Sequence, residues 1–201
     1  KQVFMSFLTD PYSHFNNKTK LTRRVLEILL HYQIPVSILS KGGYNVLQDI
    51  DIIKMFGENI QVGGSLTFTN DEDSLKWEKN GALPKERFGA LKELHDYGVR
   101  TWASMEPVIY PEQSLEIIEI TKDYVDAYKI GKLNHFPKRE KQFDWTKFLN
   151  DSIKIMRKNK KEFYIKNDLA EYANELTLMT KNERDMDYLA ISNTFVKAEL
   201  V

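Results

Sequence analysis

The sequence predicts an α/β protein, a partial (β/α)6 barrel of the TIM-like kind with parallel strands. Short apolar runs and amphipathic helical segments alternate about six times along the 201 residues, and this alternation is typical of parallel strands joined by helical crossovers. No hairpin signal and no domain boundary interrupts it. Polar residues follow the predicted strands. A barrel explains this better than an open doubly wound sheet, because a barrel gathers its site at the carboxyl ends of all its strands.

The predicted strands are short and apolar. The first opens the stretch 4–12, which runs from alternating apolar residues into Thr-Asp-Pro-Tyr, and the others cover residues 36–39, 60–68, 100–109, 125–133 and 162–166. Helical spacing predicts helices over residues 17–33, 46–56, 84–98, from 111 onward, 144–160 and 167–176. We interpret residues 70–83 as a polar connection. Residues 1–177 then form the partial barrel, and residues 178–201 form a charged tail with no assigned structure.

Composition narrows the class of partner. Basic and acidic residues number 29 each, so no global charge favours nucleic acid or a membrane surface. No apolar run approaches the ~20 residues of a membrane span, and no signal peptide is visible. The chain contains no cysteine. We therefore expect no disulfide framework, no membrane partner and a cytoplasmic location.

The first two predicted strand ends carry candidate ligand-binding residues. Asp10, next to Thr9, could accept hydrogen bonds from an amine, although a turn closed by Asp10 before Pro11 is the better interpretation of this stretch alone. Lys41 follows an apolar strand, where its ammonium could pair with a carboxylate or phosphate or simply reach water.

Two further strand ends carry hydroxyl and acidic groups. Ser65 follows the glycines at 63 and 64, which leave room for a bulky ligand. Glu106 ends an otherwise apolar strand, where an unpaired acid would be costly to bury. A salt bridge to a barrel lysine or arginine and a contact with a ligand, such as a ribose hydroxyl, are equally good interpretations of Glu106.

Several kinds of site have no support in the sequence. The four histidines show no paired spacing, so we expect no metal site built on them. There is no nucleophile elbow for a Ser-His-Asp triad, and neither a G-x-G-x-x-G motif nor a P-loop is present.

An ordered series of segments resembles one family. The segments are Thr-Asp-Pro-Tyr at 9–12, Thr-Arg-Arg-Val-Leu-Glu at 22–27, Val-Ser-Ile-Leu-Ser-Lys at 36–41, Val-Gly-Gly-Ser-Leu-Thr at 62–67, Glu78 with the helix 84–98, and Glu-Pro-Val-Ile at 106–109. Together they resemble the radical S-adenosylmethionine (SAM) proteins related to spore photoproduct lyase, often called DNA repair photolyase-like. The match runs from residue 3 to about residue 135, and residues 163–169 fit the family's last strand.

The resemblance implies a partial barrel that holds SAM and a 4Fe–4S cluster. This pair would generate a 5′-deoxyadenosyl radical that abstracts hydrogen from a substrate, with the protein supplying orientation. Carried over by position, Thr9 and Asp10 would bind the methionine amino group, Lys41 its carboxylate, and Ser65 the ribose or carboxylate side. Glu106 would lie near the ribose. Ile130 and Gly131 would pack against the adenine.

The chain departs from the family in two respects. The family holds its cluster with three cysteines in a C-x3-C-x2-C loop after the first barrel strand, and this chain has none. We therefore expect a fragment that starts at the second barrel strand and is inactive alone. Its exposed barrel edge should make it self-associate or be marginally stable. Spore photoproduct lyase also places a cysteine hydrogen donor where this chain has Leu8. We expect a reaction other than thymine-dimer repair.

Three functions fit these observations. The first is the C-terminal part of a radical SAM enzyme, lyase-like and acting on an unknown substrate that could be nucleic acid. The second is a cysteine-free binding module or pseudoenzyme on the same barrel. The third is an unrelated barrel lyase or isomerase that uses Lys41 and Glu106 as an acid–base pair.

Overall fold

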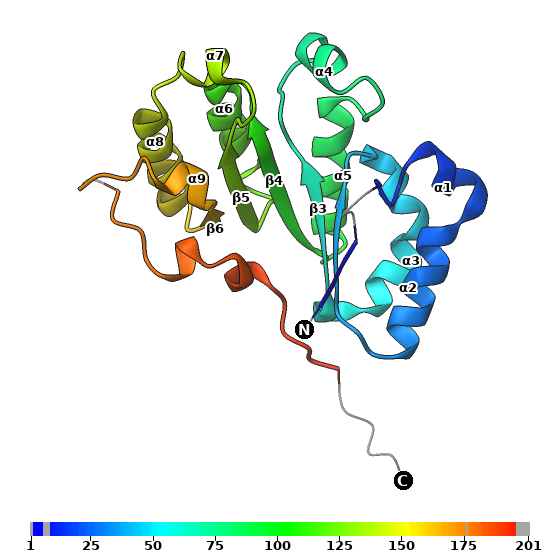
Figure 1. Cartoon of the computed structure of the whole chain (residues 1–201). Helices are drawn as coiled ribbons and strands as arrows, with labels where there is room; N and C mark the ends of the chain where they lie inside the picture. The colour runs from blue at the N-terminus through cyan, green and yellow to red at the C-terminus, as the bar shows by residue number, and fades with distance from the viewer. Residues whose placement is uncertain (1, 6–8, 176, 196–201) are drawn as a thin grey trace.

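The computed structural model describes residues 2–5, 9–175 and 177–195. These residues form one six-stranded sheet in which all neighbouring strands are parallel and follow the order β1-β2-β3-β4-β5-β6 (Figure 1). The predicted α/β class is confirmed. The sheet is open, and its sequential order is that of a partial (β/α) barrel.

The strands are β1 (Val3–Met5), β2 (Val36–Ser40), β3 (Ile60–Ser65), β4 (Arg100–Val108), β5 (Ala127–Lys132) and β6 (Glu162–Ile165). The helices are α1 (His14–Thr19), α2 (Leu21–His31), α3 (Ile50–Met55), α4 (Asp71–Trp77), α5 (Pro84–Asp96), α6 (Pro111–Thr121), α7 (Pro137–Glu140), α8 (Trp145–Lys158) and α9 (Asn167–Ala170). The described residues also contain four 3-10 turns: η1 (Gly43–Asp49), η2 (Gly57–Asn59), η3 (Asn182–Arg184) and η4 (Met186–Leu189).

The two faces of the sheet have different partners. In β4, Ala103 and Met105 point toward the helices and belong to the main hydrophobic core. Trp102 lies on the opposite side, which we call the inner face, and packs with Ala127 and Tyr164. This division follows from the strand period of two. It gives the sheet one face buried under helices and one face on which polar side chains can gather.

Gly63 is required by the packing of the inner face. A Cβ at this position would lie 2.3 Å from the Trp102 indole. The indole therefore lies directly over the backbone of β3. The sequence analysis expected this glycine to admit a ligand, and in the structure it admits Trp102.

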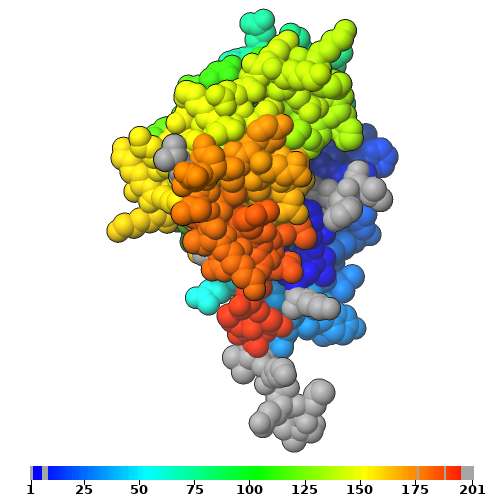
Figure 2. Space-filling view, turned by 60° about the vertical axis from the view of Figure 1, so that its left-hand side comes forward, coloured from blue at the N-terminus to red at the C-terminus, as the bar shows by residue number. Residues whose placement is uncertain are grey.

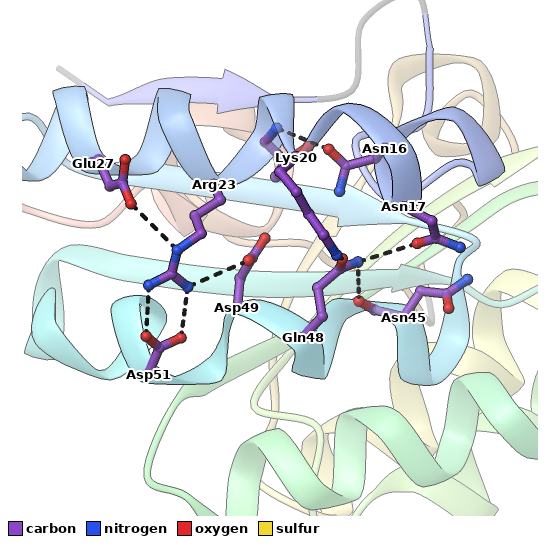
Figure 3. Close-up of polar contacts among 10 residues, drawn as sticks. Asn16, Asn17, Lys20, Arg23, Glu27, Asn45, Gln48, Asp49 and Asp51 are labelled. Atoms are coloured by element: carbon purple, nitrogen blue, oxygen red, sulfur yellow. Dashed lines mark hydrogen bonds and ion pairs between the residues drawn. The ribbon is translucent and has the colours of Figure 1, made fainter.

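The helix predicted over residues 17–33 is interrupted. α1 and α2 meet at Lys20, which has a left-handed backbone (φ 52°). The Asn16 side chain accepts a hydrogen bond from the Thr22 backbone N–H at 2.9 Å and so caps the start of α2. Figure 3 shows Asn16 at this junction, and it shows Arg23 of α2 paired with Asp51 of α3.

Several other predicted boundaries were wrong. Residues 70–83 are not a simple polar connection, because α4 forms there and the Asn70 side chain accepts a hydrogen bond from the Asp73 N–H. The helix predicted over residues 46–56 begins as the 3-10 turn η1. The strand 60–68 ends at Ser65, and the last predicted helix ends at Ala170. Within the predicted first strand and last helix, residues 6–8 and 176 lie outside the described residues.

The C-terminal segment (residues 177–195) crosses the inner face. Leu189 is 2% exposed and packs with Trp102, Ala127 and Tyr164. The Gln61 side chain donates a hydrogen bond to the Leu189 carbonyl at 3.1 Å, and the Ile191 N–H donates to Gln2 Oε1 at 3.2 Å. In Figure 2 this orange and red segment extends across the visible surface to the blue N-terminal residues. The tail left unassigned in the sequence analysis therefore covers part of the sheet.

Among the described helices, none is both long enough and apolar enough to cross a membrane.

Candidate functional site at the carboxyl ends of the strands

Asp10, which follows β1 in the sequence, is hydrogen-bonded to residues at the end of β2. Its Oδ1 accepts hydrogen bonds from the Tyr12 N–H at 2.8 Å and from the Ser40 hydroxyl at 2.7 Å, and its Oδ2 accepts one from the Lys41 N–H. The bond from the Tyr12 N–H closes the turn at Asp10 that the sequence predicted. A carboxylate has about four acceptor positions, so one position on Oδ2 is left for a ligand. Thr9, the neighbouring candidate, is exposed.

The Lys41 ammonium is already paired. Lys41 Nζ lies 2.5 Å from Glu78 Oε1, and Arg87 Nη1 lies 2.6 Å from Glu78 Oε2. Arg87 also donates to the carbonyl oxygens of Ser65 and Ala82. Burial raises the pKa of Glu78, but the charges of Arg87 and Lys41 outweigh this and hold that pKa below its ordinary value. A ligand carboxylate at Lys41 would therefore compete with Glu78.

Glu106 forms the salt bridge that was one of its two interpretations. Its Oε1 lies 2.7 Å from Lys166 Nζ, at the end of β6. Burial raises the Glu106 pKa despite the nearby Lys166 charge. A Cβ on Gly131 would lie 2.4 Å from Glu106 Oε1 and 2.8 Å from Lys166 Cδ. Gly131 thus makes room on the inner face for this ion pair. The side chains of Glu106 and Lys166 are 29% and 44% exposed, so a ligand can reach the pair.

The sheet register places four polar residues in one row on the inner face. Ser65 is the register partner of Ser104, Ser104 of Lys129, and Lys129 of Tyr164. The row therefore runs across β3, β4, β5 and β6, two residues before Glu106 in β4 and two residues before Gly131 in β5. Ser65 was a candidate in the sequence analysis. The other three were missed, although a lysine inside the apolar strand 125–133 was a visible signal.

Ile130 lies on the other face of the sheet. Its side chain is 0% exposed and belongs to the core under the helices, while the neighbouring Gly131 faces Glu106 and Lys166. The inner face therefore receives Gly131 but not the Ile130 side chain. Lys41 and Glu106, the suggested acid–base pair, each pair with a different residue, Glu78 and Lys166. Asp10 is thus hydrogen-bonded to the Lys41 backbone N–H. Ser65 and Glu106 both lie on the inner face.

An iron–sulfur cluster does not fit the residues of this chain. Cluster ligation requires thiolates, and the 201 residues contain no cysteine. Within the described ranges, histidine, aspartate and glutamate side chains form no group of three arranged to hold a metal ion. SAM does fit in part, since the strand ends offer an acceptor at Asp10 and the Ser65 hydroxyl.

The fold is similar to that of two solved structures. SuiB of Streptococcus suis, solved bound to S-adenosylmethionine, matches with a TM-score of 0.61 over 85% of this chain and 41% of SuiB, at 12% identity. A domain of the pyruvate-formate lyase-activating enzyme of Bacteroides vulgatus matches with a TM-score of 0.56 over 82% of this chain and 98% of that domain, at 7% identity. At these identities the likeness is one of fold.

In sequence, the chain is similar to the uncharacterized protein MJ0683 of Methanocaldococcus jannaschii. The two are 34% identical over 142 residues, which cover 69% of this chain and 53% of the relative. The chain thus spans about half the length of that relative. No protein-family model matches it.

Proposed function

We propose that this chain is part of a radical SAM enzyme and that its inner face binds SAM. The observation that carries the proposal is the shared fold with SuiB bound to S-adenosylmethionine, over 85% of this chain. The polar groups at the strand ends support it, because parallel (β/α) folds place ligands at that edge. The enzyme class and the cofactor are therefore proposals about the whole protein, of which this chain is the barrel part.

The residues of this chain have distinct tasks in the proposed site. Asp10 would accept a hydrogen bond from the methionine amino group at its remaining Oδ2 position. Ser65 would donate to the ribose or the carboxylate, and Gly131 would leave room for the ion pair that borders the ligand. Glu106 and Lys166 would border the ribose. When bound beside a cluster, SAM supplies the means to abstract a hydrogen atom from a substrate.

The cluster thiolates would come from residues outside this chain. We propose that the family's three-cysteine loop precedes these residues in the natural protein. The nucleotide sequence upstream in the gene tests this directly. Cysteines spaced C-x3-C-x2-C there would support the proposal. A gene with no cysteine at all would favour the second candidate, a binding module or pseudoenzyme on the same fold.

We also propose a subgroup, the proteins related to spore photoproduct lyase, on the strength of the ordered segments from residue 9 to residue 109. Nucleic acid is then the first substrate class to test. Because Leu8 stands where spore photoproduct lyase has its cysteine hydrogen donor, we expect no repair of thymine dimers by the whole protein. Release of repaired thymines from irradiated DNA would contradict this.

Binding of SAM to the protein is the central experiment. Equilibrium dialysis with labelled SAM should show binding that weakens about tenfold in Ser65→Ala and in Asp10→Asn, the expected effect of losing a hydrogen bond to a charged or strongly polar group. Ser74→Ala, a buried serine of α4, is the control and should bind normally. Absence of binding in a cluster-reconstituted natural form, or equal binding by all variants, would refute the cofactor assignment.

A further inference from the structure

The polar groups in the row of Ser65, Ser104, Lys129 and Tyr164 lack hydrogen-bond partners among the described residues. Within the described ranges, no hydrogen bond joins the two serine hydroxyls, the Lys129 ammonium or the Tyr164 hydroxyl to another protein group. Ser65, Ser104 and Tyr164 are 6%, 5% and 7% exposed. None of these polar atoms is among the fully buried atoms without a partner, so a ligand can reach them. Ser104, Lys129 and Tyr164 lie on three adjacent strands and can all donate to one ligand.

Lys129 is the charged member of the row. Its ammonium lies 4.7 Å from the centre of the Trp102 ring and 5.9 Å from that of Phe4. It forms no ion pair with any described carboxylate. Burial lowers the Lys129 pKa, and the charges of Glu106 and Asp187 only partly offset this. The aromatic rings stabilise the ammonium, but a half-buried charge without a counter-ion remains costly.

The surrounding charges decide which ligand can occupy this place. Above the row, Glu106 is neutralised by Lys166 at 2.7 Å. On the other side, Asp187 of the C-terminal segment influences Lys129 without pairing with it. Among the described residues, Lys166 is matched by Glu106, whereas Lys129 is a positive charge without an ion-pair partner. Hydroxyl and ammonium donors around one positive charge are the chemistry that binds an oxyanion.

We infer that Ser104, Lys129 and Tyr164 of this row bind an oxyanion of the substrate, a carboxylate or a phosphate, with Lys129 as its counter-ion. Ser104 and Tyr164 would donate hydrogen bonds to the same oxyanion from either side of Lys129. The inference rests on the proposed function in one respect, because it places the substrate on the same inner face as SAM. It is distinct in that Lys129 and Tyr164 have no part in the proposed SAM site.

The Trp102 indole can report on binding at this site. Three tryptophans are present, and Trp102 is the one beside Lys129. The indole N–H signal of Trp102 in a nitrogen–proton correlation spectrum can be assigned by its loss in Trp102→Phe. Titration of the protein with inorganic phosphate, and separately with acetate, should shift this signal. The ion that binds more tightly shows whether the site prefers a phosphate or a carboxylate.

Two variants and a control test the role of Lys129. In Lys129→Met, which keeps length and apolar stem, phosphate or acetate should bind at least about tenfold more weakly, the effect of one charged hydrogen bond. Lys129→Arg keeps the charge and should retain most of the binding. Lys154→Met, an exposed lysine of α8, should behave as the unchanged protein. Circular dichroism would confirm that each variant is folded.

The outcomes separate the two proposals. Loss of oxyanion binding in Lys129→Met with unchanged SAM binding supports the inference. Equal oxyanion binding in Lys129→Met and the unchanged protein, or no shift of the Trp102 signal with either ion, overturns it and leaves the SAM proposal standing. Loss of SAM binding in Lys129→Met also overturns it, because the row would then belong to the cofactor. Oxyanion binding without any SAM binding refutes only the proposed function.

Discussion

Glu78 is the counter-ion of the two cations near the end of β2. It is 9% exposed and bridges Lys41 and the buried Arg87, so the two cations share one carboxylate. The sequence placed Lys41 at a strand end correctly, but its counter-ion comes from a residue 37 positions later. Strand period and turn signals specify where a side chain leaves the sheet. They do not specify which distant side chain meets it.

Replacing Glu78 by Gln should destabilise the protein by about 3 kcal/mol at pH 7, since it leaves the buried Arg87 without a counter-ion. The folded-state pKa of Glu78 lies below its ordinary value of 4.5. Its stabilising contribution is therefore fully present above that value and is lost as pH falls through the lowered pKa. The difference between Glu78→Gln and the unchanged protein should shrink below about pH 4.5.

Urea unfolding at a series of pH values measures this difference. Glu72→Gln, an exposed acid of the preceding helix α4, should change the free energy of unfolding by less than about 0.5 kcal/mol. A Glu78→Gln cost that stays constant from pH 7 to pH 3 would show that the ion pair does not supply it.

Asp10 and Glu106 illustrate what residue-level reasoning can decide. The sequence left each with a structural and a ligand-binding interpretation, and the structure contains the turn at Asp10 and the salt bridge at Glu106. Both residues keep access to a ligand. A structural contact and a functional one are therefore compatible at these positions, because a carboxylate has more acceptor positions than one partner uses.

At the scale of elements, periodicity identified the main strands and the long helices but not their ends. The break between α1 and α2 depends on Asn16, which is 5% exposed and caps α2 by a tertiary hydrogen bond across six residues. α4 was missed because its first turn is acidic and its apolar stripe is short. Acidic residues suit a helix start, so the run Asp71-Glu72-Asp73 after Asn70 was a usable signal.

Asn16→Ala should lower the free energy of unfolding by about 1–2 kcal/mol, because the start of α2 loses its cap. Asn17→Ala is the matched control. Asn17 is exposed and only accepts a long hydrogen bond of 3.4 Å from Gln48, so its replacement should cost less than about 0.5 kcal/mol. Thermal unfolding followed by circular dichroism compares the two, and equal losses would count against the cap.

At the scale of the molecule, the C-terminal segment closes part of the inner face. Its polar composition gave no periodic pattern, so the sequence could not place it. The placement depends on apolar residues that are far apart along the segment, Met179, Leu189 and Phe195, and on bonds from backbone N–H groups to side chains, such as that from the Thr194 N–H to Asn59 Oδ1 at 2.7 Å. Isolated anchors of this kind leave almost no trace in a sequence, since their partners are far away along the chain.

Leu189→Ala should destabilise the protein by about 2–3 kcal/mol, because it opens a cavity beside Trp102, Ala127 and Tyr164. Leu178→Ala is the control on the same segment. Leu178 is 78% exposed, and its loss should change stability by less than about 0.5 kcal/mol. Urea unfolding followed by tryptophan fluorescence gives both values. If the two variants are equally stable, the segment does not anchor through Leu189.

The position of this segment along the chain also sets an order of events during synthesis. The sheet is complete once β6 has been made, at Ile165, but Leu189 and Thr194 follow only later. At typical elongation rates, the ribosome takes roughly two to six seconds to add the residues between Ile165 and Thr194. Until Leu189 docks, the Trp102 side of the sheet lacks the cover of this segment. A molecule that binds the inner face thus meets its widest entrance on the nascent chain, before the segment has docked.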